Sequence, residues 1–221
     1  MSSREGKMKN NDQNRNFILY DAMPWVGMGL EAFLRPLSTV TQSVASLSEL
    51  KTVLSQQPRQ TVIMELYGAQ ECLYDGLYFI LHEKAFWPNT PWIVLTDIKN
   101  HSVLRLLSSS PDSVLVSKCD GLAAILDGIS AAHHGVHYLS PTIRRCIAGR
   151  QKITAFRQLS DSEWRILALM AAGFSVKSIA TATYRSYKTV STHKLNIMHK
   201  LGLNQCGFIH LLLSLRTRWP C

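Results

Sequence analysis

The stretch from Leu159 to Leu215 is punctuated so regularly that it constrains the fold more than any other part of the chain. Ser160 is followed three residues later by Glu163. At this spacing the hydroxyl and the carboxylate each satisfy one of the unpaired N–H groups that begin a helix. Gly173 suits the left-handed position that ends this first helix, and Ser175 suits the cap of a second. The sequence therefore predicts a run of short helices with defined ends.

A third helix is predicted over residues 187–201, capped by Ser186 and ended by Gly202, and a fourth helix follows a cap at Asn204. Apolar residues recur on one face of the third helix at Val190, Ile197 and Leu201. The other side carries Lys188, Ser191, Thr192, Leu195 and Asn196. A helix with a packed back and a polar, basic front fits the major groove of DNA, which is wide enough to admit one.

Four short motifs in this stretch carry a resemblance to a known family. They are Leu-Ser-x-x-Glu from Leu159, Gly-x-Ser-x-Lys-x-Ile-Ala from Gly173, Ser-x-x-Thr-Val-x-x-His from Ser186 and Lys-Leu-Gly from Lys200. Together they resemble the LuxR-type helix-turn-helix of the NarL/FixJ regulators. The resemblance implies a four-helix domain whose third helix enters the major groove while the second crosses the DNA backbone.

The chain departs from the family pattern at three positions. Ser191 stands where the family often has lysine, which leaves the identity of the base contacts open. Thr183 and Arg185 stand where the family usually has apolar residues, and these changes predict a looser turn between the second and third helices.

The distribution of charge favours DNA over the alternative, a helical bundle used only for protein contacts. Residues 141–221 contain 13 Lys+Arg and 2 Asp+Glu, hence a net charge of +11. The remaining 140 residues contain 11 and 13, hence −2, and the two parts together give the +9 of the whole chain. A basic excess confined to the last third is expected where phosphates must be neutralised.

The residues expected to contact DNA form two sets. The groove-facing set is Lys188, Thr189, Ser191, Thr192, Leu195 and Asn196. The second set, at the DNA backbone, is Lys177, Lys194 and Lys200, together with Ser175 at the start of the second helix. Phosphate contacts position a protein on the duplex, whereas base contacts specify the sequence.

The N-terminal part alternates short apolar strands with helical patterns. Strands are predicted at residues 17–20, 38–45, 61–66, 91–96 and 113–116, and helices at 24–34, 46–54, 70–83, 100–108 and 120–132. Continuous apolar strands that alternate with helices indicate a parallel sheet covered on both faces. The predicted fold class is therefore α/β: a doubly wound parallel sheet of five βα units, followed by the all-α four-helix domain.

This order of elements is similar to the receiver domain of response regulators. The matching residues are Asp21 after the first strand, Thr96 at the end of the fourth, Lys118 after the fifth, and the segment His137-Tyr138-Leu139-Ser140-Pro141 at the domain exit. The resemblance implies a site at the carboxyl ends of the strands, where such sheets bind ligands. In the family, two adjacent acids hold Mg²⁺ and an aspartate at the end of the third strand accepts phosphate.

The chain lacks two parts of that site. The acidic pair is Asp21-Ala22, so one carboxylate is missing from a site that depends on charged oxygen ligands. The third-strand position is Glu65, whose extra methylene misplaces its carboxylate for in-line phosphoryl transfer. We therefore predict that Asp21, Glu65, Thr96 and Lys118 form a degenerate phosphoacceptor site, with Glu65 a fixed negative charge near Thr96 and Lys118 or merely a polar residue that caps a strand.

The predicted domains are a disordered tail over 1–15, a degenerate receiver-like domain over 16–139, a linker over 140–157 with a short helix at 141–148, and the helix-turn-helix domain over 158–218. Apolar runs fall short of the roughly 18 residues that a membrane helix needs. The polar N-terminus is not a secretory signal, which predicts a cytoplasmic, nucleoid-associated protein without membrane contact. Five scattered cysteines without a Cys-x-x-Cys pair, and the group His133, His134 and His137, predict neither a disulfide framework nor a metal site. No cofactor and no enzymatic activity are predicted.

The predicted function is sequence-specific, phosphorylation-independent regulation of transcription by a dimer on double-stranded DNA. The dimer is a homodimer or a heterodimer with another LuxR-type response regulator, and RNA polymerase is an expected partner. A broken acidic site on a LuxR-type chain resembles the auxiliary regulators of the Rcs capsule-synthesis kind. The alternative is a ligand-sensing LuxR-type regulator whose N-terminal domain binds a small molecule.

Overall fold

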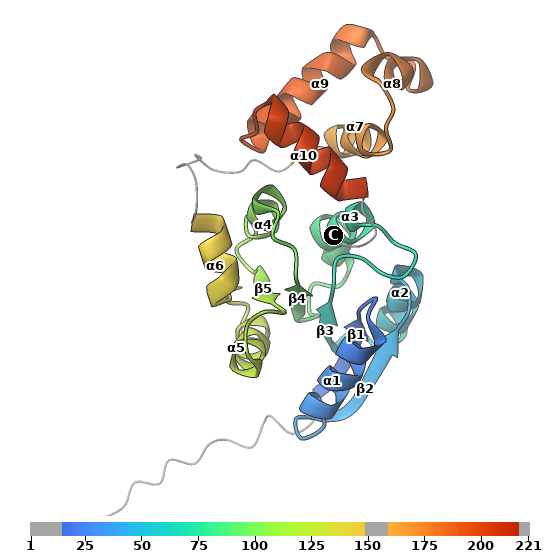
Figure 1. The fold of residues 1–221 in the computed structure, drawn as a ribbon. Helices are drawn as coiled ribbons and strands as arrows, with labels where there is room; N and C mark the ends of the chain where they lie inside the picture. Colours follow the sequence, from blue (N-terminus) through green and yellow to red (C-terminus); the bar gives the residue numbers. More distant parts are fainter. Residues whose placement is uncertain (1–14, 149–158, 217–221) are drawn as a thin grey trace, which may run out of the picture.

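The computed structural model describes residues 15–148 and 159–216, which form an α/β domain and a helical domain (Figure 1). The predicted N-terminal tail lies outside the described residues except for its last residue, Arg15. Among the described residues, no helix combines the length and apolar character needed to cross a membrane.

The α/β domain contains six parallel strands. In spatial order they are β2 (Ser38–Val44), β1 (Arg15–Tyr20), β3 (Thr61–Met64), β4 (Trp92–Thr96), β5 (Val114–Ser117) and β6 (Tyr138–Leu139). Every residue of β3, β4 and β5 is buried, as expected for central strands covered on both faces. The predicted doubly wound parallel sheet is confirmed. The sixth strand was not predicted, because two residues are too few to show a period.

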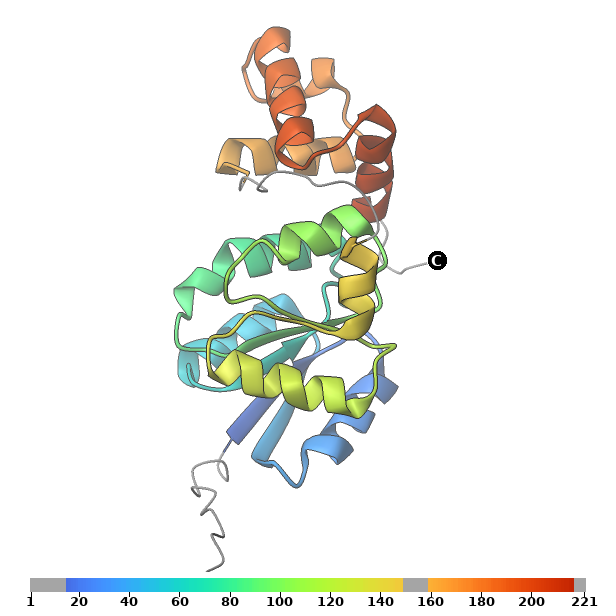
Figure 2. The same cartoon turned by 90° about the vertical axis from the view of Figure 1, so that its left-hand side faces the viewer.

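Helices cover both faces of the sheet (Figure 2). On one face lie α1 (Pro24–Leu34) and α5 (Leu122–His133), whose inward residues share a core with β1, β3, β4 and β5. On the other face lie α2 (Leu47–Gln56), α3 (Leu73–Leu81) and α4 (His101–Leu107), and a 3₁₀ turn, η1 (Glu83–Phe86), follows α3. Gly76 lets α3 approach the segment after β3 closely, since a Cβ there would lie 1.9 Å from the carbonyl oxygen of Leu66.

The first part of the predicted linker is a helix packed on the α/β domain. This helix, α6 (Pro141–Ala148), follows β6 directly, and its residue Ile143 is buried in the core beside α4 and β5. The remaining linker residues, 149–157, lie outside the described residues. The α/β domain therefore extends at least through α6.

The helical domain contains α7 (Asp161–Ala171), α8 (Val176–Ala182), α9 (Tyr187–Lys200) and α10 (Gln205–Arg216). The predicted caps are present. The hydroxyls of Ser160, Ser175 and Ser186 each accept a hydrogen bond from the backbone N–H three residues on. Gly173 and Gly202 end α7 and α9 with φ angles of 94° and 61°. The four-helix prediction is confirmed.

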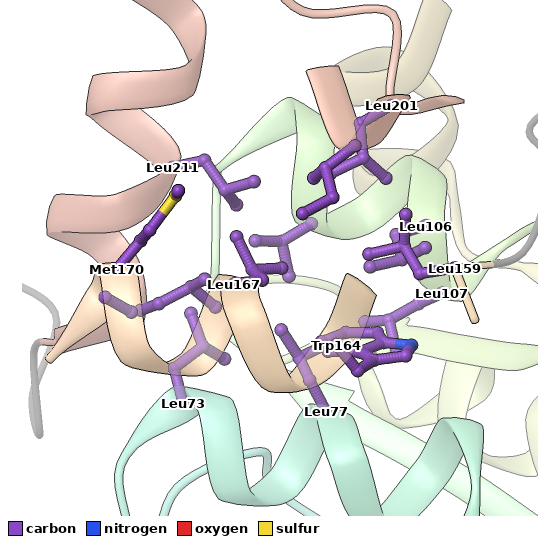
Figure 3. Close-up of a cluster of buried hydrophobic side chains, with 14 of the residues drawn as sticks. Leu73, Leu77, Leu106, Leu107, Leu159, Trp164, Leu167, Met170, Leu201 and Leu211 are labelled. Atoms are coloured by element: carbon purple, nitrogen blue, oxygen red, sulfur yellow. The ribbon is translucent and has the colours of Figure 1, made fainter. Parts of the chain in front are cut away.

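The two domains pack against each other through apolar side chains. Leu73 and Leu77 of α3 point toward Trp164 and Leu167 of α7, and all four belong to one buried cluster (Figure 3). At the other end of the contact, the Asn100 amide donates to the Ser214 hydroxyl on α10 at 2.9 Å. Because α7 and α10 form this contact, α8 and the start of α9 lie on the side of the helical domain remote from the sheet (Figures 1 and 2).

Candidate DNA-binding interface and the degenerate acidic site

The back of α9 is fixed in the core of the helical domain. Val190 and Ile197 are fully buried, and Leu201, which caps the helix, is buried beside them. They belong to one buried cluster with residues of α7 and α8, including Trp164 and Ile179. The apolar spacing that the sequence shows therefore orients the helix, so that its opposite side faces solvent.

The exposed front of α9 is centred on four residues at helical spacing: Lys188, Thr192, Leu195 and His199. They are separated by four, three and four positions and so form one line along the helix, and all four are exposed. We call this line the groove face. Thr189 and Asn196 are exposed beside it on one flank, while Ser191 is half-buried on the other. His199 is absent from the predicted set, although the same spacing rule applied one turn further would have found it.

The residues predicted at the DNA backbone lie in different environments. Ser175 and Lys177 are exposed at the start of α8. Lys194 is half-buried, and its ammonium group lies 5.7 Å from the centre of the Phe208 ring. Lys200 has its ammonium group 2.6 Å from the buried carboxylate of Glu163, so it joins the end of α9 to the start of α7.

Arg185 strengthens the turn between α8 and α9. Its guanidinium donates to the Ser162 hydroxyl at 3.3 Å and to the His193 ring at 3.1 Å, so it ties the turn to α7 and α9. This arrangement differs from the looser turn expected from a polar residue at this position. The preceding residue, Tyr184, is 98% exposed and has a φ of 53°, a conformation that asparagine or glycine adopts more readily.

The structure brings together all four residues predicted for the degenerate acidic site. Asp21 follows β1, Thr96 ends β4, and Lys118 follows β5. The Lys118 ammonium group lies 2.6 Å from Asp21 Oδ2 and 3.0 Å from Glu65 Oε2. Glu65 also accepts a hydrogen bond from the backbone N–H of Leu66 at 2.7 Å. The site is thus a compact cluster at the carboxyl edge of the sheet.

Burial dominates the electrostatics of this cluster. It raises the pKa of Glu65 to about 7, although Lys118 and the Leu66 N–H act in the opposite direction. Burial alone would lower the pKa of Lys118, but the negative charges of Glu65 and Asp21 outweigh it and raise that pKa. A carboxyl group with a pKa of about 7 is roughly half protonated at neutral pH, so the charge of Glu65 depends on pH in this range.

The cluster carries its own cation. Lys118 already pairs with Asp21, and the neighbouring position is Ala22, which supplies no second carboxylate. A divalent cation prefers several charged oxygen ligands and would have to displace Lys118 from Asp21. His133, His134 and His137 each contact a different oxygen, those of Thr61, Ser130 and Ser110.

Comparisons with known proteins find both a matching family profile and relatives that match most of the chain. Residues 157–207 match the family profile of the bacterial regulatory proteins, luxR family. The transcriptional regulatory protein RcsB of Escherichia coli K12 is 27% identical over 209 residues, which cover 91% of this chain and 95% of that protein.

Two solved structures resemble the chain over nearly its whole length. One holds two RcsB dimers bound to two parallel DNAs; it has a TM-score of 0.56, is 27% identical, and covers 91% of this chain and 99% of that one. The other is RcsB from Salmonella enterica serovar Typhimurium bound to promoter P1flhDC in the presence of the phosphomimetic BeF3−, with a TM-score of 0.55 and 25% identity over 93% of this chain and 100% of that one. The C-terminal domain is therefore a LuxR-type helix-turn-helix domain, and the N-terminal domain is receiver-like.

Proposed function

We propose that this chain, a LuxR-type regulator built like a response regulator, controls transcription by binding double-stranded DNA through the groove face of α9. The observation that carries the proposal is the division of α9 into a fully buried back, at Val190 and Ile197, and an exposed front that begins at Lys188. The basic excess of residues 141–221 supplies the electrostatic attraction to phosphate. The similar RcsB structures bound to DNA support the same role. Such a protein is expected at the bacterial nucleoid.

Two variants separate base contacts from phosphate contacts. Lys194→Ala is expected to weaken binding to all duplexes alike and to reduce the slope of log affinity against log salt by about one. Thr192→Ala is expected to change the ranking of duplexes, because it alters the groove face. Lys99→Ala is the matched control, since Lys99 is exposed on the α/β domain. If Lys194→Ala and Thr192→Ala behaved alike, the assigned roles would be wrong.

Lys200 has a different role in this proposal. Its ammonium group is held by Glu163, which is 4% exposed, so a DNA phosphate would compete with a buried carboxylate for the same cation. We infer that Lys200 chiefly stabilises the helical domain. Lys177 and Lys194 remain the proposed phosphate contacts, with Ser175 at the start of α8.

We propose further that the receiver-like domain acts without phosphorylation. Three features of the cluster support this: the Asp21–Lys118 ion pair, the alanine beside Asp21, and a glutamate at the acceptor position. The full chain would be incubated with Mg²⁺ and acetyl phosphate, and its intact mass measured. An unchanged mass and unchanged DNA affinity are expected. A phosphoryl group on Glu65, located by peptide mass spectrometry, would contradict the proposal.

The receiver-like domain is proposed to provide a dimerisation surface. Trp25 and Met28 of α1, and Leu122 and Leu126 of α5, are large exposed apolar side chains on the two helices that cover one face of the sheet. One small helix-turn-helix module buries too little to select a site in a genome, so a second copy or a second regulator is required. The RcsB dimers on DNA are consistent with either pairing.

Co-purification distinguishes the two pairings. The full chain is expressed alone and with RcsB, and the mass of each complex is measured by light scattering. Met28→Glu, which puts a charge on α1, is expected to reduce dimerisation, whereas Ser48→Glu on the exposed side of α2 is expected to have no effect. Operator binding by this chain alone at nanomolar affinity would count against an obligate heterodimer. Contact with RNA polymerase stays a prediction.

A cavity supports the second candidate function, ligand sensing. It has a volume of about 580 Å³ and lies where the carboxyl edge of the sheet meets α10, lined by residues that include Asp97, Lys99, His210 and Leu213. This volume is within the range of small-molecule sites. Thermal-shift screening of the full chain against metabolites tests it. A shift that Leu213→Trp abolishes without lowering the melting temperature of the free protein would favour this function.

A further inference from the structure

Leu195 lies where a DNA-binding helix is normally polar. Its side chain is 62% exposed, although it is a large aliphatic group in the middle of the groove face, between Thr192 and His199. The buried side of α9 is complete without it, since Val190, Ile197 and Leu201 already fill the core. The leucine therefore does not serve the packing of its own domain.

Thr192, the neighbour of Leu195 on the groove face, makes the surroundings of Leu195 more apolar. The Thr192 hydroxyl donates to the carbonyl of Lys188 at 2.9 Å, so its hydrogen is directed along the helix. An aliphatic group and a threonine lie next to each other at helical spacing, with Lys188 at one end and His199 at the other. The centre of the groove face thus offers an apolar surface, whereas its ends offer polar and basic groups.

The major groove presents one apolar group to such a surface, the C5 methyl of thymine. We propose that Leu195 determines specificity by packing against the methyl group of a thymine in each half-site that this chain occupies. The inference rests on the proposed function, since it needs α9 to lie in the major groove. Beyond that function, the base that is read is thymine, the group that is read is its C5 methyl, and the side chain that reads it is Leu195.

The size of the effect follows from the burial of one methyl group. Covering one aliphatic carbon is worth a factor of about four in affinity at room temperature. Loss of the thymine methyl is therefore expected to weaken binding about four-fold for each half-site. Loss of the leucine side chain is expected to remove the dependence on that methyl.

The experiment uses the full chain and duplex DNA in which single thymines are replaced by deoxyuridine, which lacks only the C5 methyl. Duplexes are first selected from a random pool by the wild-type protein, in the presence of RcsB if the pair co-purifies. Each thymine of the best duplex is then replaced in turn. One thymine per half-site is expected to show the four-fold loss with wild type and no loss with Leu195→Ala. Ile209→Ala is the matched control, because Ile209 is a 47% exposed aliphatic residue that lies on α10 and outside the candidate ligand cavity.

The outcomes separate this inference from the proposed function. Failure to select any duplex overturns both. A selected duplex in which no thymine is sensitive to loss of its methyl overturns the inference alone. The inference is also overturned if Leu195→Ala keeps the sensitivity, or if Ile209→Ala removes it. Loss of sensitivity in Leu195→Ala alone, with unchanged folding by circular dichroism, supports it.

Discussion

Glu65 has a pKa well above the ordinary value of a glutamate, and a Glu65→Gln variant tests the reason. Burial raises the pKa of this carboxyl from 4.5 to about 7. Between pH 4.5 and about 7, the Glu65 carboxyl therefore carries a proton in the folded state but has released it in the unfolded state. By linkage, the free energy of unfolding falls as pH rises through this window, and the loss is complete above about pH 7.

The magnitude follows from the two pKa values. Integrated between pH 5 and pH 8, a shift from 4.5 to about 7 costs the folded wild type roughly 2–3 kcal/mol. Glutamine has a similar shape and does not titrate, so Glu65→Gln lacks this cost. The difference in unfolding free energy between variant and wild type should thus move in favour of the variant by roughly 2–3 kcal/mol from pH 5 to pH 8.

The assay is urea unfolding of both proteins at pH 5, 6, 7 and 8, because the difference between them cancels the other titrating groups. Lys118→Met provides a second arm. The ammonium group opposes the rise in the Glu65 pKa, so its removal should raise that pKa further and steepen the pH dependence. A difference between Glu65→Gln and wild type that stays constant across this range would refute the argument. It would mean that Lys118 keeps Glu65 ionised in the folded protein.

Three further predictions concern contacts within each domain and between the two domains. Gly76→Ala should lower the free energy of unfolding by roughly 1–3 kcal/mol in urea melts, because its Cβ would meet the Leu66 carbonyl oxygen at 1.9 Å. Gly29→Ala is the control: a Cβ at Gly29 would meet no atom within 4 Å, so this change should stabilise α1. Lys200→Met should destabilise the chain by roughly 3–5 kcal/mol, since it leaves the Glu163 carboxylate buried without its cation. Burial acts to raise the pKa of Glu163, but hydrogen bonds from Lys200 and Ser160 outweigh it and lower that pKa. The ionised carboxylate therefore contributes to stability above pH 4.5, and this contribution is lost as pH falls through the lowered pKa. Measuring the free energy of unfolding at decreasing pH checks this, and equal losses of stability in wild type and Lys200→Met would contradict it. Burial against α7 lowers the pKa of His82, although the nearby Asp161 acts to raise it. The free energy of unfolding should therefore fall as pH drops below 6.5. In urea melts at pH 5 to 7, His82→Gln should make the free energy of unfolding less dependent on pH.

The helical domain could be predicted almost completely from its sequence. Its helix ends depend on local contacts, such as the Ser160 hydroxyl with the backbone of Glu163, and these span three residues of chain. The buried back of α9 also follows from spacing alone, because a helix repeats every 3.6 residues wherever it packs. The groove-face position of His199 lies within reach of the same rule.

The features that depend on long-range contacts, such as the pKa of Glu65 and the ion pair of Lys200, could be found only in the tertiary structure. The sequence could name Asp21, Glu65, Thr96 and Lys118, but the pKa of Glu65 depends on how deeply four separate strand ends bury it. The sequence could assign a positive charge to Lys200, but it could not identify Glu163, the buried carboxylate 37 residues away that binds this charge. The two-residue strand β6 and the packing of α3 on α7 likewise have no local signal, because each needs a surface contributed by another part of the chain. Periodicity and caps are properties of a segment, whereas burial and ion pairing are properties of the whole fold.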